Sequence, residues 1–273
     1  MINVSIVLYN SNFQEISTLV KCLKDIPDVR HIYLVDNSLT KDNLYETLSV
    51  DYKFNGLNRG YGCGHNLAIQ ESIDSGIKYH LVLNSDIRFD NSELLKLLAK
   101  IESDAKIGMI MPKILNEDES VQLLPKLLPT PLNLLIRVIK PLQIIFKKIN
   151  KEYTLAEYNE YEFNVPILSG CFSLFRVDAL KDVGLYDEKF FMYFEDFDLS
   201  RRIHCKYKTI YYPTASIIHT HERGAAKSLK LFMIFIKSSI IYFNKYGWFY
   251  DYQRKIINKN VLKGIKKDKK VIK

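Results

Sequence analysis

Apolar residues along the first hundred positions follow two different periods. Short runs of Val, Ile, Leu and Tyr, typical of buried strands, lie near residues 3–9, 31–36, 51–55 and 79–84. Between these runs, apolar residues recur at helical spacing and predict helices near 13–25, 64–75 and 91–103. Strands that alternate with helices imply βαβ units. We therefore expect an α/β fold with a mostly parallel central sheet and helices on both faces.

This pattern is interrupted over residues 117–162. Leu and Ile are mixed there with Lys and Arg, and the prolines predict that the segment is broken into short helices. We interpret 117–162 as a variable insertion. It is either a lid packed on the core or a basic, apolar segment that lies in a membrane interface.

Strands and helices resume after the insertion. Val165–Arg176 has the composition of a strand, and Gly170 within it allows close approach of the backbone to a ligand. A short helix that ends at Gly184 and a second helix that starts at Glu195 are predicted next. Two strands near 208–219 and an amphipathic helix over Lys227–Tyr246 complete the pattern.

Composition narrows the class of protein. The 273 residues are 47% hydrophobic and 26% charged, which is ordinary for one large globular domain. The four cysteines are scattered without a C-x-x-C pair, which fits a reducing, cytoplasmic setting. The start reads as a strand and not as a signal peptide, and no apolar stretch reaches the roughly 18 to 20 residues of a membrane span.

Charge is concentrated at the C-terminus. The net charge is +8, and residues 259–273 alone contain seven Lys against one Asp. The rest of the chain is close to neutral, which disfavours a nucleic-acid groove and predicts no nucleic-acid partner. The Lys-rich tail is either a solvated, partly disordered segment or a contact for an anionic membrane surface.

Candidate chemistry lies at the ends of predicted elements. Asn84-Ser85-Asp86 follows a buried strand, where ligands of parallel sheets bind, and Asn84 and Asp86 can face one ligand. Asp86 suits Mg²⁺ or Mn²⁺ that bridges to substrate phosphates. His219, at another strand end, can supply a further metal ligand, with His221 two residues on. An Asx turn and a structural histidine are the alternatives.

Glu195 and Asp196 occupy the first turn of a predicted helix, after the aromatic run 190–194. Unpaired N–H groups and the helix dipole stabilise a carboxylate there, and a partly apolar wall suits a general base. An acidic cap on an amphipathic helix is the alternative.

These segments together resemble the inverting, GT-A-type glycosyltransferases of family 2, in particular rhamnosyltransferase-like enzymes of bacterial O-antigen and capsule assembly. The opening strand 4–10, the acidic segment 34–38 and the glycine-rich N-x-G segment 58–66 match in order. Residues 84–86 stand for the D-x-D motif and 195–198 for the E-D-x-D helix. Asn84 departs from the family, because it replaces the first acidic residue of D-x-D and puts strict metal dependence in question.

The resemblance implies a GT-A-like, Rossmann-type catalytic domain over residues 1–225 and a C-terminal helix and basic tail over 226–273. It implies a nucleotide-sugar donor, dTDP-rhamnose or a UDP-hexose, and a lipid-linked saccharide acceptor at the inner face of the plasma membrane, reached through the tail. Asp196 would be the base, Glu195 and Gly170 would contact the acceptor, and Asp86 and His219 would hold Mg²⁺ or Mn²⁺. The remaining donor-binding residues would be Tyr9, Asn10, Asp36, Arg59, Gly60, Asn66, Asn84, Ser85 and Asp86.

Two other classes stay open on the sequence. A sugar nucleotidyltransferase shares this sheet type, but it needs a basic, glycine-rich loop after the first strand, which residues 10–13 lack. A non-catalytic protein that binds sugar nucleotides or a membrane surface is the other. The carboxylate pair and Asp86 argue against it.

Overall fold

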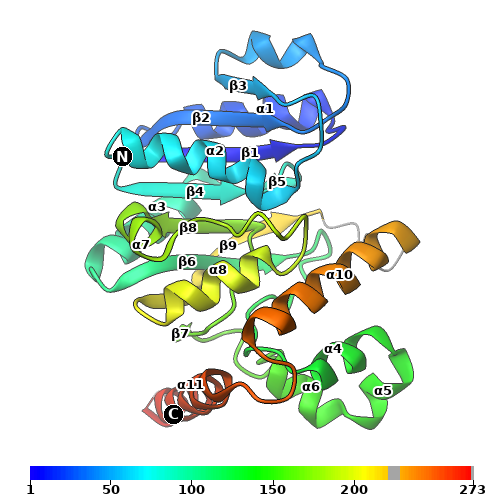
Figure 1. Cartoon of the computed structure of the whole chain (residues 1–273). Coiled ribbons are helices and arrows are strands. Elements are labelled where there is room, and N and C mark those ends of the chain that lie inside the picture. Colours follow the sequence, from blue (N-terminus) through cyan, green and yellow to red (C-terminus); the bar gives the residue numbers. More distant parts are fainter. Residues whose placement is uncertain (221–227, 272–273) are drawn as a thin grey trace.

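A single mixed sheet organises the protein, as seen in a computed structural model whose described residues are 1–220 and 228–271 (Figure 1). Within these residues the strands are β1 (Ile2–Leu8), β2 (Val29–Asp36), β3 (Asp51–Phe54), β4 (Tyr79–Leu83), β5 (Ile87–Arg88), β6 (Ile107–Leu115), β7 (Phe163–Asn164), β8 (Phe172–Arg176) and β9 (Lys208–His219).

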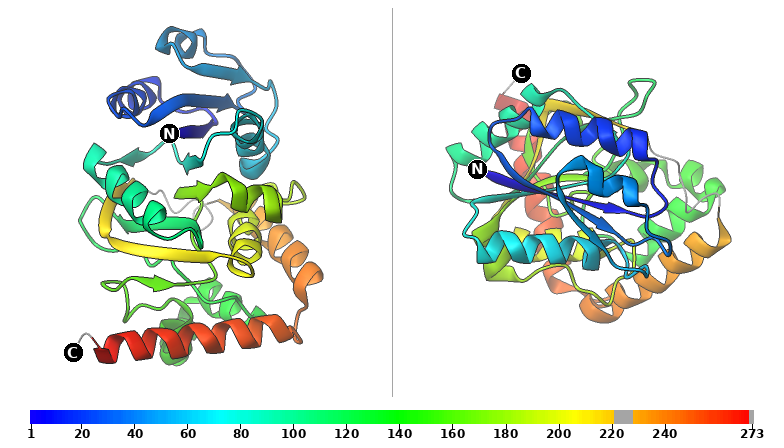
Figure 2. Two further views of the ribbon diagram at one scale, coloured as in Figure 1. Left: turned by 90° about the vertical axis from the view of Figure 1, so that its left-hand side faces the viewer. Right: turned by 90° about the horizontal axis from the view of Figure 1, so that it is seen from above.

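The helices cover both faces of this sheet (Figure 2). They are α1 (Phe13–Lys24), the 3₁₀ helix η1 (Asn43–Leu48), α2 (Tyr61–Asp74), α3 (Asn91–Ser103), α4 (Pro131–Val138), α5 (Lys140–Ile145), α6 (Lys147–Tyr153), α7 (Val177–Val183), α8 (Glu195–His204), α10 (Leu229–Tyr246) and α11 (Tyr252–Val271). Helices α1 and α3 lie on one face, and α2, α7 and α8 on the other.

The sheet is parallel in its first half and mixed in its second. Its strand order is β3-β2-β1-β4-β8-β6-β9-β5, and β7 pairs with β9. Strands β1 to β4 pair in parallel, as βαβ units require. Strand β8 runs antiparallel to both β4 and β6, and β5 and β7 run antiparallel to β9. The expected parallel pairing therefore holds for residues 1–83 and for β6 with β9, whereas β5, β7 and β8 add antiparallel pairs to the sheet.

The glycine-rich segment forms the start of a helix and not a free loop. Helix α2 begins at Tyr61, three residues earlier than expected, so Gly62 and Gly64 lie in its first turns. A Cβ on Gly62 would lie 2.8 Å from the Cβ of Tyr186, and a Cβ on Gly64 would lie 2.7 Å from a methyl of Val7. Gly62 and Gly64 therefore allow α2 to pack closely against Tyr186 and Val7. This packing explains both glycines without a phosphate-binding loop.

Three strand predictions need correction. Only Phe172–Arg176 of the expected strand 165–176 is a strand, because the preceding residues form a loop that bonds to β9 and to Lys126. The two strands expected near 208–219 are one strand, whose register slips between Tyr212 and Ser216. Strand β6, at the centre of the sheet, was not predicted at all.

The insertion and the C-terminal segment are both packed on the body. Leu134 of α4 is buried in a cluster with Tyr242 and Phe243 of α10, so the lid alternative holds for the inner face of α4. Val261 and Ile265 of α11 belong to the main core. The expectation of a partly disordered tail is therefore wrong up to Val271. The expected boundary at 225 lies outside the described residues.

Candidate active site

The ends of β1 and β2 bring three predicted donor-binding residues together. Leu8 pairs with Asp36, and the Asn10 N–H donates to Ser38 Oγ over 2.8 Å. Asp36 is buried; its Oδ1 accepts from the Ser38 N–H at 2.9 Å and its Oδ2 from the Tyr52 hydroxyl at 2.8 Å. Tyr9 is exposed beside this turn. The structure brings these residues together, and their role in binding the donor stays a prediction.

The predicted metal ligands converge on one imidazole. His219 Nε2 lies 3.3 Å from Asp86 Oδ1 and 3.3 Å from Asn84 Nδ2. The antiparallel pairing of Ile87 with His219 creates this contact between β5 and β9. Gln122 holds the other side of the ring, with its Oε1 at 3.2 Å from His219 Nδ1 and its Nε2 donating to the His219 carbonyl. Ser85 lies half-buried between the two ligand positions. His221 is outside the described residues.

The cluster suits a metal ion that is also coordinated by the phosphates of the substrate. Burial alone would lower the pKa of His219, but hydrogen bonding to Asp86 and Cys171 outweighs it and raises the pKa to about 10. A metal ion would displace that proton. In the described part of the chain, no three His, Cys, Asp or Glu side chains form a complete metal site. Mg²⁺ is commonly held by one or two protein groups plus substrate phosphates, and Asp86 with His219 fits that pattern.

Tyr61 joins the metal-ligand cluster to the predicted base. Its hydroxyl lies 2.9 Å from Asn84 Oδ1 and 2.7 Å from the Gly170 carbonyl oxygen, and its one hydrogen is shared between them. The Gly170 N–H in turn donates to Asp196 Oδ2 over 3.2 Å. Burial raises the pKa of Tyr61, so the phenol stays neutral and links Asn84 to Gly170. Sequence reasoning missed this residue.

The carboxylate pair begins α8 after two residues of left-handed backbone. Tyr193 and Phe194 both have φ of 67°, a conformation that costs energy for aromatic residues and is concentrated at functional sites. Asp196 is half-buried, and its Oδ1 also accepts from the Phe197 N–H at 2.9 Å. Glu195 is buried, and its Oε2 has no hydrogen-bond partner among the described residues.

Burial sets the proton affinity of both carboxyl groups. It raises the pKa of Glu195 well above the ordinary value, and the adjacent Asp196 raises it further. Burial also raises the pKa of Asp196, against the opposing effects of the Gly170 N–H and the charge of Lys126. Two neighbouring carboxyl groups with raised pKa values are typical of acid–base sites.

Lys126 is a second residue that sequence reasoning missed. Its side chain is buried, with Nζ 3.2 Å from the Leu124 carbonyl and 5.5 Å from the centre of the Phe197 ring. Burial lowers its pKa to about 7, and the nearby charge of Arg137 acts in the same direction. A lysine was visible in the insertion, but nothing in the sequence showed that it would face α8.

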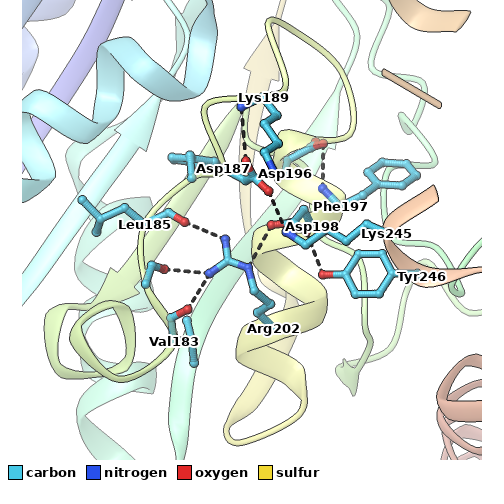
Figure 3. A network of polar contacts seen from close by, with 12 residues as sticks. Val183, Leu185, Asp187, Lys189, Asp196, Phe197, Asp198, Arg202, Lys245 and Tyr246 are labelled. Atoms are coloured by element: carbon cyan, nitrogen blue, oxygen red, sulfur yellow. Dashed lines mark hydrogen bonds and ion pairs between the residues drawn. The ribbon is translucent and has the colours of Figure 1, made fainter. Parts of the chain in front are cut away.

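Asp198, the last residue of the acidic motif, ties α8 to α10 (Figure 3). It is fully buried, and it contacts Arg202 Nε at 2.8 Å, the Tyr246 hydroxyl at 2.7 Å and Lys245 Nζ at 2.6 Å. Helix α10 thus holds α8, the helix that carries the predicted base.

The remaining predicted donor residues lie around the start of α2. Gly60 is buried with φ of 95°, and its carbonyl accepts from the Asn37 amide. Arg59 is exposed beside Cys63. Both ends of the Asn66 amide bond to the backbone of Tyr186, and its Nδ2 also reaches Glu188, so its role toward the donor stays a prediction. Asn66 fastens α2 to the loop before α8.

Known proteins share this sequence pattern. The chain is 28% identical over 204 residues to the low-salt glycan biosynthesis hexosyltransferase of Haloferax volcanii, covering 73% of this chain and 61% of that protein. It is 27% identical over 184 residues to the N-acetylglucosaminyl-diphospho-decaprenol L-rhamnosyltransferase of Mycobacterium tuberculosis, covering 62% and 59%. The chain therefore spans about three fifths of each relative.

A solved structure shares the fold. GalNAc-T7, solved with UDP, GalNAc and Mn²⁺, superposes with a TM-score of 0.54 and 18% identity over 80% of this chain and 43% of that one. This likeness confirms the GT-A-type α/β class. The family model described as glycosyl transferase family 2 matches residues 4–184, which is most of the chain. The protein belongs to glycosyl transferase family 2.

Proposed function

We propose that this protein transfers a sugar, with inversion, from a nucleoside-diphosphate donor to a hydroxyl of a lipid-linked acceptor. The observation that carries the proposal is the connection from Asn84 through Tyr61 and Gly170 to Asp196, with Asp86 and His219 beside Asn84 at its other end. It fixes a candidate base and a candidate phosphate-binding cluster relative to each other, as a transfer between two bound substrates requires.

In this mechanism Asp196 accepts the proton of the acceptor hydroxyl as the oxygen attacks the anomeric carbon. The bond to the nucleoside diphosphate breaks in the same displacement, which inverts the configuration. Glu195, whose pKa is raised by burial, orients the acceptor by hydrogen bonding. Asp86 and His219 would hold Mg²⁺ or Mn²⁺, which supplies positive charge beside the departing diphosphate. The Mn²⁺ in GalNAc-T7 supports this choice of ion.

The relatives guide the choice of substrates. One is named a rhamnosyltransferase that acts on a diphospho-decaprenol sugar, and the other a hexosyltransferase. We infer dTDP-rhamnose or a UDP-hexose as the donor, and assembly of a bacterial surface polysaccharide, such as O-antigen or capsule, as the process. Such an acceptor places the enzyme peripherally at the inner face of the plasma membrane. Across the described residues, none of the helices is long and apolar enough to cross a bilayer.

Replacing the base tests the proposal. Asp196→Asn should lower transfer to a short prenyl-diphospho-N-acetylglucosamine by about two to four orders of magnitude, the usual effect of losing a general base. Donor binding, measured by calorimetry, should remain. Asp178→Asn changes an exposed carboxylate of α7 and is the matched control. Near-normal turnover in Asp196→Asn would assign the base elsewhere.

The metal assignment has its own test. Asp86→Ala should abolish the enhancement of nucleotide binding by Mn²⁺, because it removes the one charged oxygen ligand of the cluster. His219→Ala should weaken the enhancement less. Full activity of the native protein in a chelator would show that Asn84 marks a loss of metal use.

A further inference from the structure

Helices α4 and α5 present an apolar surface to solvent. The exposed side chains on it, which we call the α4–α5 surface, are Leu132, Leu135, Val138, Ile139, Ile144 and Ile145. Ile144 and Ile145 are 80% and 70% exposed. Leu132, Leu135 and Val138 follow one another at i, i+3 spacing along α4, and exposed apolar side chains that share a helix face mark an interaction site.

The stretch of sequence that carries this surface has charge of a single sign. Residues 120–151 contain six Lys and Arg residues and no Asp or Glu. Arg137, Lys147 and Lys148 are exposed beside the apolar side chains. Helices that expose Leu and Ile flanked by cations are typical of segments that lie in the interface of an anionic bilayer. The core of a protein–protein interface is instead depleted of Lys.

The inner face of α4 connects this surface to the candidate active site. Leu134 packs in one cluster with Phe190 and Phe194, and Phe194 directly precedes Glu195. The start of α4 is fixed by a reciprocal cap between Thr130 and Asn133. The α4–α6 lobe lies on the side of the molecule to which the arrowheads of β1 and β4 point (Figure 1). A substrate held at the lobe is therefore on the side of the strand ends.

We propose that the α4–α5 surface docks on an anionic lipid bilayer and so brings Asp196 to an acceptor anchored there. The docking stands on the surface alone, whereas the delivery of an acceptor rests on the proposed function. This assigns membrane contact to the insertion, in place of the Lys-rich α11. Lys259 and Lys263 of α11 are exposed, but Val261 and Ile265 of the same helix face the protein core.

Vesicle flotation without any sugar nucleotide tests the docking. The full chain should bind vesicles of equal parts phosphatidylcholine and phosphatidylglycerol, and bind phosphatidylcholine alone much less. Ile144→Ser with Ile145→Ser should lower the partition coefficient at least about tenfold, because two aliphatic side chains lose their burial in lipid. Thermal unfolding should not change, since both side chains are exposed in the protein.

Two variants serve as comparisons. Leu39→Ser with Leu44→Ser changes side chains that are 71% and 51% exposed at the opposite end of the molecule, and should leave binding within about twofold of the native value. Replacing exposed lysines of α11 by Gln tests the rival surface at Lys259, Lys263, Lys266 and Lys267. This variant should retain most of the binding.

Three outcomes would overturn the docking. They are unchanged vesicle binding in the Ile144/Ile145 variant, loss of binding only in the α11 variant, and conversion of a native dimer to a monomer by the Ile144/Ile145 substitutions. Transfer assays then separate the two proposals. Loss of transfer to a vesicle-borne acceptor, with transfer to a short soluble acceptor retained, supports both. Vesicle binding by a native chain that transfers to neither acceptor would support the docking and reject the proposed function.

Discussion

The proton affinity of Asp196, the proposed base, is set by its burial and by its neighbours. Burial raises its pKa above the ordinary 3.8, while the Gly170 N–H and the positive charge of Lys126 act against that rise. Glu195 and Lys126 are titratable groups near it, and Arg137 lies near Lys126. A base is active when deprotonated, so transfer should increase as pH rises through the pKa of Asp196.

The first prediction at this scale concerns Lys126→Met. Lys126 has a pKa of about 7, so it carries its charge at lower pH, where that charge acts against the rise in the pKa of Asp196. Removing that charge should raise the pKa of Asp196 and move the acidic limb of the pH–rate profile to higher pH. The measurement is kcat/KM across pH with a soluble acceptor.

Lys126→Arg should restore the acidic limb, because the charge returns. If Lys126→Met lowers turnover equally at every pH, then Lys126 only supports packing. Lys126 would in that case have no electrostatic effect on the base.

Some site residues could be predicted from sequence because their positions within elements identify them. Asp36, Asp86 and His219 each lie at or just past a strand end, and Asp196 lies in a first helical turn. Tyr61 and Lys126 could not be predicted, because their roles depend on contacts remote in sequence. The hydroxyl of Tyr61 meets a carbonyl 109 residues away. Motif position alone likewise could not show that the Asn66 amide bonds to the 186–188 loop.

At the scale of elements, α8 is held by α10 through buried charge. Arg201 pairs with Asp251 at 2.7 Å and 2.9 Å and lies 3.9 Å from the centre of the Tyr246 ring. Asp198 accepts from Tyr246, Lys245 and Arg202 on the same side of the helix (Figure 3). These contacts hold α8, whose first turn carries Glu195 and Asp196, against α10 and against Asp251, which follows α10.

Tyr246→Phe tests this connection. It removes one hydrogen bond to a buried carboxylate and should lower the free energy of unfolding by about 1–3 kcal/mol. Turnover should fall as well, because the start of α8 loses a restraint. Tyr250→Phe changes a hydroxyl on an 83% exposed residue and should have no effect on denaturant unfolding. Equal stability of the two variants would contradict a role for Tyr246 in holding α8.

Elements were predictable where local pattern and tertiary packing agree. Helices α1 and α3 begin and end within one residue of the predicted bounds, since their apolar faces are regular. Residues 165–171 are apolar enough for a strand but serve as a loop, because their backbone bonds to Thr209 and Lys126. Residues 208–219, predicted as two strands, form the single strand β9, which continues through Pro213.

At the scale of the whole molecule, the two ends of the chain share one core. Val261 and Ile265 of α11 lie in the same buried cluster as β1, and Asn258 bonds the backbone of Leu128 in both directions. A Lys-rich composition hid this packing, because charge runs are usually solvated. The exposed lysines of α11 cover one side of the helix while its other side completes the body.

Truncation tests whether α11 is part of the fold. Deleting residues 255–273 removes Val261 and Ile265 from the core, and each buried aliphatic side chain contributes roughly 1.5–3 kcal/mol. A loss of about 3–6 kcal/mol is a large share of the roughly 5–15 kcal/mol that stabilises a domain. The truncated chain should therefore unfold at a much lower temperature and lose transfer to soluble and lipid-linked acceptors alike.

The matched variant keeps α11 and replaces Lys259, Lys263, Lys266 and Lys267 by Gln. Its melting temperature should stay near the native value, because these side chains are exposed and surface charges contribute little to stability. A truncated chain that melts normally and still transfers to a soluble acceptor would show that α11 is dispensable for the core. Membrane contact would then have to be sought in the tail as well as in α4 and α5.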